Sequence, residues 1–179
     1  MLTALLSGAF ALIGVALGGF SSHFLSLRRE REARNHQITT QNRDLLRSKR
    51  EELYSILAIW STLLINNNLT FSGAMRGKIT YDEANDIFIK NAERSEVKFE
   101  RIDLLIDAYC PEVRPLYDIF LNIRSEINSI FFDFKNQYDK AGPYESYSQL
   151  KPYLSSGAKF EKAADHLKKE IVQRIREMD

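Results

Sequence analysis

The amino-terminal stretch of the chain reads LTALLSGAFALIGVALGGFSSHF from Leu2 to Phe24. It contains no Lys, Arg, Asp or Glu. As an α-helix it would extend over about 35 Å, enough to cross a hydrocarbon core of about 30 Å. Arg28 and Arg29 follow directly, and a basic flank of this kind stays in the cytoplasm. The sequence therefore predicts a transmembrane anchor over residues 1–27, with the amino terminus outside.

Two other interpretations of this stretch are a cleavable signal peptide and a buried core helix. A cleavable signal peptide would need a basic segment before the apolar run, and Met1, Leu2 and Thr3 supply none, although Ala16-Leu17-Gly18 offers a small-residue cleavage pattern. A buried core helix is the third interpretation. It is disfavoured because the run is long and its downstream flank is strongly basic.

One face of the predicted anchor carries small residues at helical spacing. Gly14 and Gly18 form the G-x-x-x-G spacing that lets two membrane helices approach closely. The whole face consists of Ser7, Ala11, Gly14, Gly18 and Ser22. We expect this face to pack against a second copy, and the alternative is a chance match, since small residues are common in membrane helices.

The charges of the chain are confined to the rest of the sequence. All 25 Lys and Arg and all 24 Asp and Glu of the 179 residues lie after residue 27. A net charge of +1 gives no global reason to expect nucleic-acid binding. The single cysteine, Cys110, excludes an intrachain disulfide and leaves no cluster for zinc. It also agrees with a reducing cytoplasm.

Residues 28–45 are predicted to form a basic juxtamembrane stalk helix. From Arg28 to Arg50 there are eight Lys or Arg and three Asp or Glu. Basic side chains just below a membrane attract anionic headgroups, at roughly 1 kcal/mol each. We expect anionic lipid contacts from Arg28, Arg29, Arg31 and Arg34.

Residues 46–179 are predicted to form an antiparallel bundle of about four helices, giving an all-α protein. Leu53, Leu57, Trp60 and Leu64 follow a heptad-like spacing in a helix that is expected to end at Asn66. Thr80 and Glu83 form a capping box for a helix expected to reach Tyr109. The remaining helices are expected from Pro111 to about Gly142 and from about Phe160 to Met178, with residues 144–156 in a loop or short turn.

Charged residues also recur on helix faces. The basic stripe contains Arg43, Arg47 and Arg50, and the acidic stripe contains Glu93, Glu96, Glu100, Asp103 and Asp107. One hypothesis is that the two stripes meet, within one chain or between protomers. The alternative is that both are solvated faces with local pairs worth tenths of a kcal/mol.

Catalytic groups are scarce in this sequence. No histidine follows a glutamate by three positions, the spacing that carboxylate-bundle metal sites use. Cys110 has His166 as its only distant soluble partner for nucleophilic chemistry, and nothing in the sequence brings the two together. We therefore expect neither catalytic residues nor a cofactor or metal.

The layout of the chain resembles a loose group of uncharacterised bacterial single-pass membrane proteins. The resemblance rests on Gly14, Gly18 and Gly19 in the anchor, Arg28-Arg29-Glu30-Arg31-Glu32, Glu51-Glu52-Leu53-Tyr54 and Tyr109-Cys110-Pro111. It implies a bacterial inner membrane with a cytoplasmic helical domain. It brings no activity and no functional residues.

Taken together, these features predict a non-enzymatic, membrane-anchored protein. Its helical bundle would serve as an interaction or self-assembly module, with the lipid bilayer, further copies and an unidentified protein as partners, and without nucleic acid. One alternative is an effector whose anchors oligomerise into a pore or perturb the bilayer. A second is a carboxylate-metal enzyme that uses residues 93–107.

Overall fold

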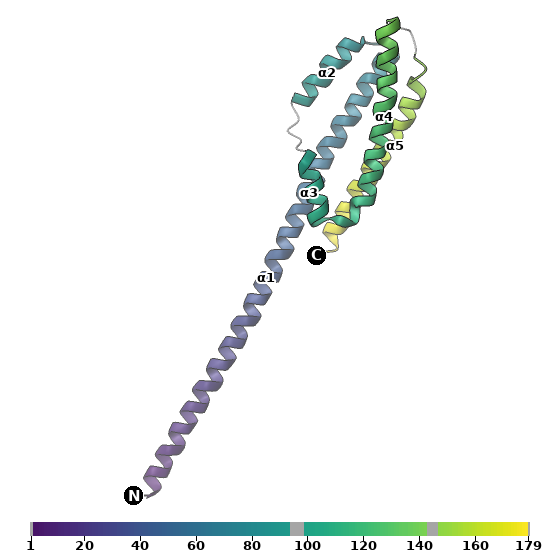
Figure 1. The fold of residues 1–179 in the computed structure, drawn as a ribbon. Helices are drawn as coiled ribbons and strands as arrows, with labels where there is room; N and C mark the ends of the chain where they lie inside the picture. Colours follow the sequence, from purple (N-terminus) through teal and green to yellow (C-terminus); the bar gives the residue numbers. More distant parts are fainter. Residues whose placement is uncertain (1, 94–98, 143–146, 179) are drawn as a thin grey trace. The chain divides into compact units, whose positions relative to one another are not determined.

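The computed structural model describes residues 2–93, 99–142 and 147–178, which are helical almost throughout (Figure 1). Of residues 2–22, 24 and 25 it describes the backbone but not the side chains. The helices are α1 (Leu2–Met75), α2 (Tyr81–Glu93), α3 (Phe99–Tyr109), the 3-10 helix η1 (Pro111–Val113), α4 (Arg114–Ala141) and α5 (Leu150–Arg176). None of the described ranges contains a strand, so the all-α class is confirmed.

The chain divides into two compact units, residues 1–45 and residues 46–179. The first unit is the amino-terminal part of α1. There Arg28 pairs with Glu32 one turn later at 3.2 Å, and both side chains are largely exposed.

The second unit is a helical bundle. The 46–75 part of α1 and helix α4 run in one direction, whereas α2, α3 and α5 return in the other (Figure 1). The core follows the predicted apolar stripes. Leu53, Leu57 and Trp60 of α1 are buried in one cluster with Phe120 and Phe160 of the later helices. Burial of these side chains supplies the main favourable term for the fold.

Helix α1 continues beyond the end predicted at Asn66, so this prediction was wrong. Asparagine favours helix ends, but Asn67 is buried and α1 runs on to Met75. Phe71, Ala74 and Met75 extend the apolar stripe by further turns and are buried in the core. Core burial therefore outweighs the local helix propensity of the three asparagines.

Two further boundaries differ in detail. Helix α5 begins at Leu150 rather than near Phe160, and Pro152 lies in its first turn, where a missing N–H breaks no intrahelical bond. The helix predicted from Tyr81 to Tyr109 is described as α2 and α3, and residues 94–98 between them lie outside the described part.

Both predicted helix signals at the other boundaries are found. The Thr80 hydroxyl accepts a bond from the Glu83 N–H at 3.1 Å, and Glu83 Oε2 accepts one from the Thr80 N–H at 2.8 Å. Helix α4 ends at Gly142, whose φ of +73° lies in the left-handed region that glycine adopts without steric cost.

Candidate functional site

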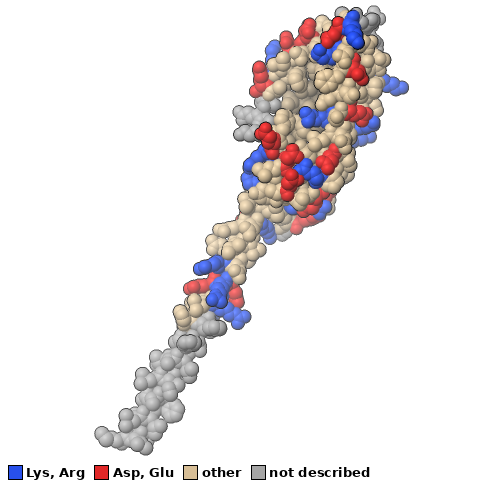
Figure 2. Space-filling model, in the orientation of Figure 1, with Lys and Arg blue, Asp and Glu red and all other residues tan. Residues whose placement is uncertain are grey.

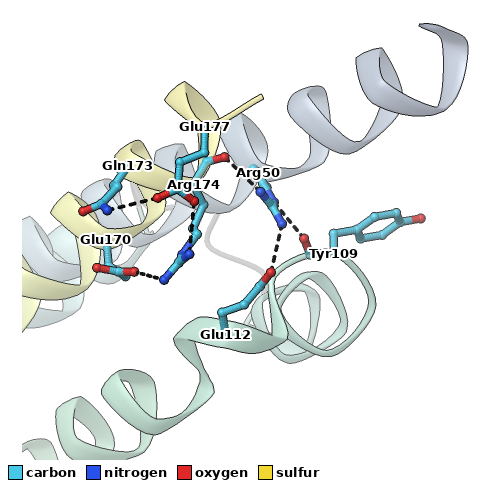
Figure 3. A network of polar contacts seen from close by, with 7 residues as sticks. All are labelled: Arg50, Tyr109, Glu112, Glu170, Gln173, Arg174 and Glu177. Carbon is cyan, nitrogen blue, oxygen red and sulfur yellow. Dashed lines mark hydrogen bonds and ion pairs between the residues drawn. The ribbon is translucent and has the colours of Figure 1, made fainter. Parts of the chain in front are cut away.

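Arg50, the last residue of the predicted basic stripe, is buried and lies where two other helices end (Figure 3). It donates hydrogen bonds to the carbonyl oxygen of Tyr109 at 3.0 Å and to that of Arg174 at 2.9 Å. Its third contact is an ion pair with Glu112 at 3.2 Å. Arg50 therefore joins α1 to the ends of α3 and α5.

The same network continues along α5. Arg174 pairs with Glu170 at 2.6 Å and with Glu177 at 3.1 Å, and Gln173 also donates to Glu177 at 3.0 Å (Figure 3). These pairs lie within one helix and its cap, so each contributes only a few tenths of a kcal/mol.

The acidic stripe has other partners. Asp103 and Asp107 both pair with Arg114 at the start of α4, and the Asp103 contact measures 2.8 Å. A salt bridge also joins α1 to α3, but its charges are reversed relative to the hypothesis. The acid Glu52 lies on α1 and the base Arg101 lies on α3. Figure 2 shows acidic and basic side chains interspersed over the visible face of the bundle.

The remaining members of the two stripes are placed as follows. Arg43 is exposed in the first unit, and Arg47 pairs with Glu51 at 3.1 Å. Glu93 and Glu100 are exposed, and Glu96 lies outside the described residues. Contact between the stripes of two protomers stays a prediction.

The predicted membrane residues fall mostly outside the description. Ser7, Ala11, Gly14, Gly18 and Ser22 belong to the part of α1 whose side chains are not described. Arg28, Arg29, Arg31 and Arg34 are exposed. Within the residues that are described, no helix combines the length and the apolar character needed to cross a membrane.

Cys110 is fully buried at the junction between α3 and η1. Burial raises the pKa of its thiol to about 11, so the thiol is protonated at neutral pH. His166 is exposed on α5. Among the described residues no group of three or more His, Cys, Asp or Glu could hold a metal ion.

A cleft of about 320 Å³ opens between the helices of the bundle. Four asparagines, one arginine, six aromatic residues and two aliphatic residues line it. Its walls are Leu64, Asn67, Asn68 and Phe71 of α1, Tyr81, Asn85 and Phe88 of α2, Arg124, Ile127, Asn128, Phe131 and Phe132 of α4, and Tyr153 of α5. We call this hollow the asparagine cleft.

The polar groups of the asparagine cleft are not all satisfied. Asn67 is only 5% exposed, and its amide oxygen accepts no hydrogen bond within the described part of the chain. Asn68, its neighbour, accepts a bond from the Tyr153 hydroxyl at 3.2 Å. A buried acceptor without a donor costs about 1–3 kcal/mol, so Asn67 marks a position at which an incoming donor would be stabilising.

A larger hollow of about 610 Å³ lies between Tyr54 of α1 and the carboxyl-terminal half of α5. Its lining side chains are mostly exposed, and one of its lysines, Lys168, pairs with Asp165 at 2.9 Å. It is a solvated groove without an unpartnered buried acceptor, so we favour the asparagine cleft as the candidate site.

Sequence reasoning missed the asparagine cleft because it interpreted Asn66-Asn67-Asn68 as the end of a helix. One signal was present, since Asn67 lies three residues after Leu64 and four before Phe71 on the same apolar stripe. A polar residue on a stripe that is otherwise apolar is a candidate functional position. Asn85, Arg124 and Asn128 carry no comparable signal.

The chain matches no protein-family model, no curated protein and no solved structure. Its function is therefore inferred from its own residues and their geometry.

Proposed function

We propose that this is a non-enzymatic, single-pass protein of the bacterial inner membrane whose cytoplasmic helical bundle is an interaction and self-assembly module. The membrane part of the proposal is supported by the charge-free stretch Leu2–Phe24 and the basic residues that follow it. The exposed side chains of Arg28, Arg29, Arg31 and Arg34 suit them to contact anionic headgroups.

Helix α2 carries the interaction part of the proposal. Ile87, Phe88 and Ile89 are consecutive and are 40%, 38% and 44% exposed. Ala84 is the one residue of α2 that is buried. These large apolar side chains lie on different sides of α2, and the apolar area that each leaves in water gains free energy when a partner covers it.

A second copy of the chain is the partner we propose for this surface. The small-residue face of the predicted anchor, with Gly14 and Gly18, would bring two chains together in the bilayer. Two bundles held side by side have a high effective concentration, so a modest apolar surface suffices for their contact.

The oligomeric state of the full-length protein in mild detergent tests this proposal. Light scattering after size exclusion should give a mass of two or more chains. The double variant Ile87→Ser with Ile89→Ser should shift the equilibrium toward monomer, because it removes exposed apolar surface from two sides of α2. The matched control Ile59→Ser with Leu104→Ser, at two positions that are each 53% exposed elsewhere on the bundle, should keep the original mass.

A monomeric full-length protein would contradict the self-assembly proposal. Equal masses for the two double variants would contradict the role of α2.

Membrane attachment is tested separately by fractionation of cells that express the full chain. We expect the protein in the membrane pellet after alkaline carbonate washing, and we expect removal of residues 1–27 to release it. Release of the full chain by carbonate or by high salt would contradict the anchor.

A further inference from the structure

Three aromatic side chains of the asparagine cleft pack against one another and form an aromatic wall. Phe71 lies 4.5 Å from Phe131 and 6.2 Å from Tyr81, measured between ring centroids. Tyr81 and Phe131 are stacked at an interplanar angle of 23°. Rings arranged in this way favour another planar ring, through offset stacking or edge contacts.

The asparagines of the cleft favour an occupant that has hydrogen-bonding groups as well as a flat ring. Asn67 needs a donor for its amide oxygen, and a purely apolar occupant would leave this oxygen unpartnered. Asn85 and Asn128 add two more amides, each with donors and an acceptor. Paired donors and acceptors of this kind complement the edge of a nitrogen heterocycle.

Arg124 is the one charged residue among the described residues that line the cleft. Its guanidinium lies 5.2 Å from the ring centroid of Trp60, and among the described residues no carboxylate pairs with it. A guanidinium with free donors at the edge of a largely apolar cleft attracts an anionic group, above all a phosphate or a carboxylate.

From these three observations we propose that the asparagine cleft binds a planar nitrogen heterocycle that carries an anionic group, the chemistry of a nucleoside monophosphate. The ring packs against the aromatic wall, its N–H groups donate to Asn67, and its phosphate binds Arg124. A volume of about 320 Å³ is at the small end of ligand pockets, which suits a single nucleotide. This inference goes beyond the proposed function and does not depend on self-assembly or on the membrane.

Trp60 supplies the readout for a binding experiment. It is the single tryptophan of the chain and lies under Arg124. We would titrate the full-length protein in detergent with AMP, GMP, CMP and UMP and follow the fluorescence of Trp60 with excitation near 297 nm. At least one of the four should give a saturable change, and ribose 5-phosphate and the matching nucleoside should bind at least about tenfold more weakly.

Two outcomes of this titration would overturn the proposal. One is the absence of a saturable change with any of the four nucleotides, measured also by calorimetry. The other is equal binding of ribose 5-phosphate, which would make the site a simple anion site.

The variant Asn67→Leu separates ligand binding from a structural role. It keeps the side-chain size and removes an unpartnered acceptor, so the thermal midpoint should stay equal or rise while nucleotide affinity falls about tenfold or more. The matched control Asn66→Leu changes an exposed neighbour and should leave the affinity unchanged. A lower midpoint with unchanged affinity would show that Asn67 is structural and would contradict the proposal.

The variant Arg124→Gln tests the anion contact without altering the aromatic walls. We expect it to abolish the preference for the nucleotide over its nucleoside and to leave nucleoside binding intact. Retention of that preference would contradict the assignment of the phosphate to Arg124. The oligomeric mass measured by light scattering should be the same for Asn67→Leu, Arg124→Gln and the unmodified protein. A failure of the ligand inference is therefore distinguishable from a failure of self-assembly.

Discussion

Arg50 carries out a task that usually falls to the residues at a helix end. The last carbonyl oxygens of a helix have no intrahelical donor. Arg50 serves one such oxygen on α3, at Tyr109, and one on α5, at Arg174, from a third helix. The planar guanidinium of arginine carries several N–H donors and can reach several acceptors at once. The compact ammonium of lysine does this less well.

We expect Arg50→Met to lower the free energy of unfolding by about 2–3 kcal/mol, because two carbonyl oxygens and Glu112 lose their donor. The free energy of unfolding of Arg50→Lys should lie between those of Arg50→Met and the unmodified protein. Chemical denaturation of the full chain followed by circular dichroism measures the change. Arg28→Ala, which removes an exposed pair, is the control and should change stability by less than about 0.5 kcal/mol. Equal effects of Arg28→Ala and Arg50→Met would refute the role of Arg50.

Glu52 makes the stability of the bundle depend on pH. Hydrogen bonds from Arg101 and then Lys49 lower the pKa of the Glu52 carboxyl from 4.5 to about 2. The folded pKa is below the unfolded one, so the stabilisation is fully present above about pH 5 and disappears as the pH falls to about 2. Solvent screening at this partly exposed pair keeps its contribution to about 1 kcal/mol or less.

Glu52→Gln should therefore destabilise the bundle at pH 7 and match the unmodified protein near pH 2. Denaturation at pH 7, 4 and 2.5 measures this convergence. The control Glu100→Gln, at an exposed carboxylate, should show no such trend. A Glu52→Gln penalty that is constant from pH 7 to 2.5 would rule out the linkage.

Helix α2 depends on its cap more than the other elements do. It buries only Ala84 and begins with the reciprocal bonds between Thr80 and Glu83. Tyr81 also packs against the core, so the cap adds to the stability that this contact gives the helix.

Thr80→Ala should weaken α2 by about 1 kcal/mol, which corresponds to about fivefold faster amide exchange along this helix. Exchange in α4 should remain unchanged. Thr62→Ala, which removes a hydroxyl bond within α1, is the control and should not affect α2. Uniform acceleration across the bundle would mean that α2 opens only when the whole unit unfolds.

The elements that the sequence predicted well are those whose own residues decide them. The helix predicted from Pro111 to about Gly142 and the capping box at Thr80 depend on local spacing and local hydrogen bonds, and both are found. The end of α1 failed because it is decided at long range. Phe71 is buried against Tyr81 and Phe131, and no local rule contains that contact.

The candidate site was predictable only in part for the same reason. Arg50 was recognised as a stripe residue, but its partners at Tyr109, Glu112 and Arg174 depend on where three helices end. The asparagine cleft takes residues from four helices, so its composition is visible only after folding.

At the scale of the whole chain, the division at residue 45 makes a direct prediction. All the core residues of the bundle lie in the second unit. A fragment from Leu46 to Asp179 should therefore unfold in one cooperative transition, within a few degrees of the bundle transition in the full chain. Calorimetry measures both. A fragment without a transition would show that the bundle needs the first unit.

The position of Arg50 has a consequence for how the bundle forms in time. Its two carbonyl partners are 59 and 124 residues away along the chain, so its hydrogen bonds close only after the distant helices have come together. We expect such late contacts to be absent from the folding transition state. Arg50→Lys should then speed unfolding and leave the folding rate nearly unchanged, as stopped-flow chevron plots would show. Arg50 would act as a latch that sets the lifetime of the folded bundle rather than the speed at which it forms.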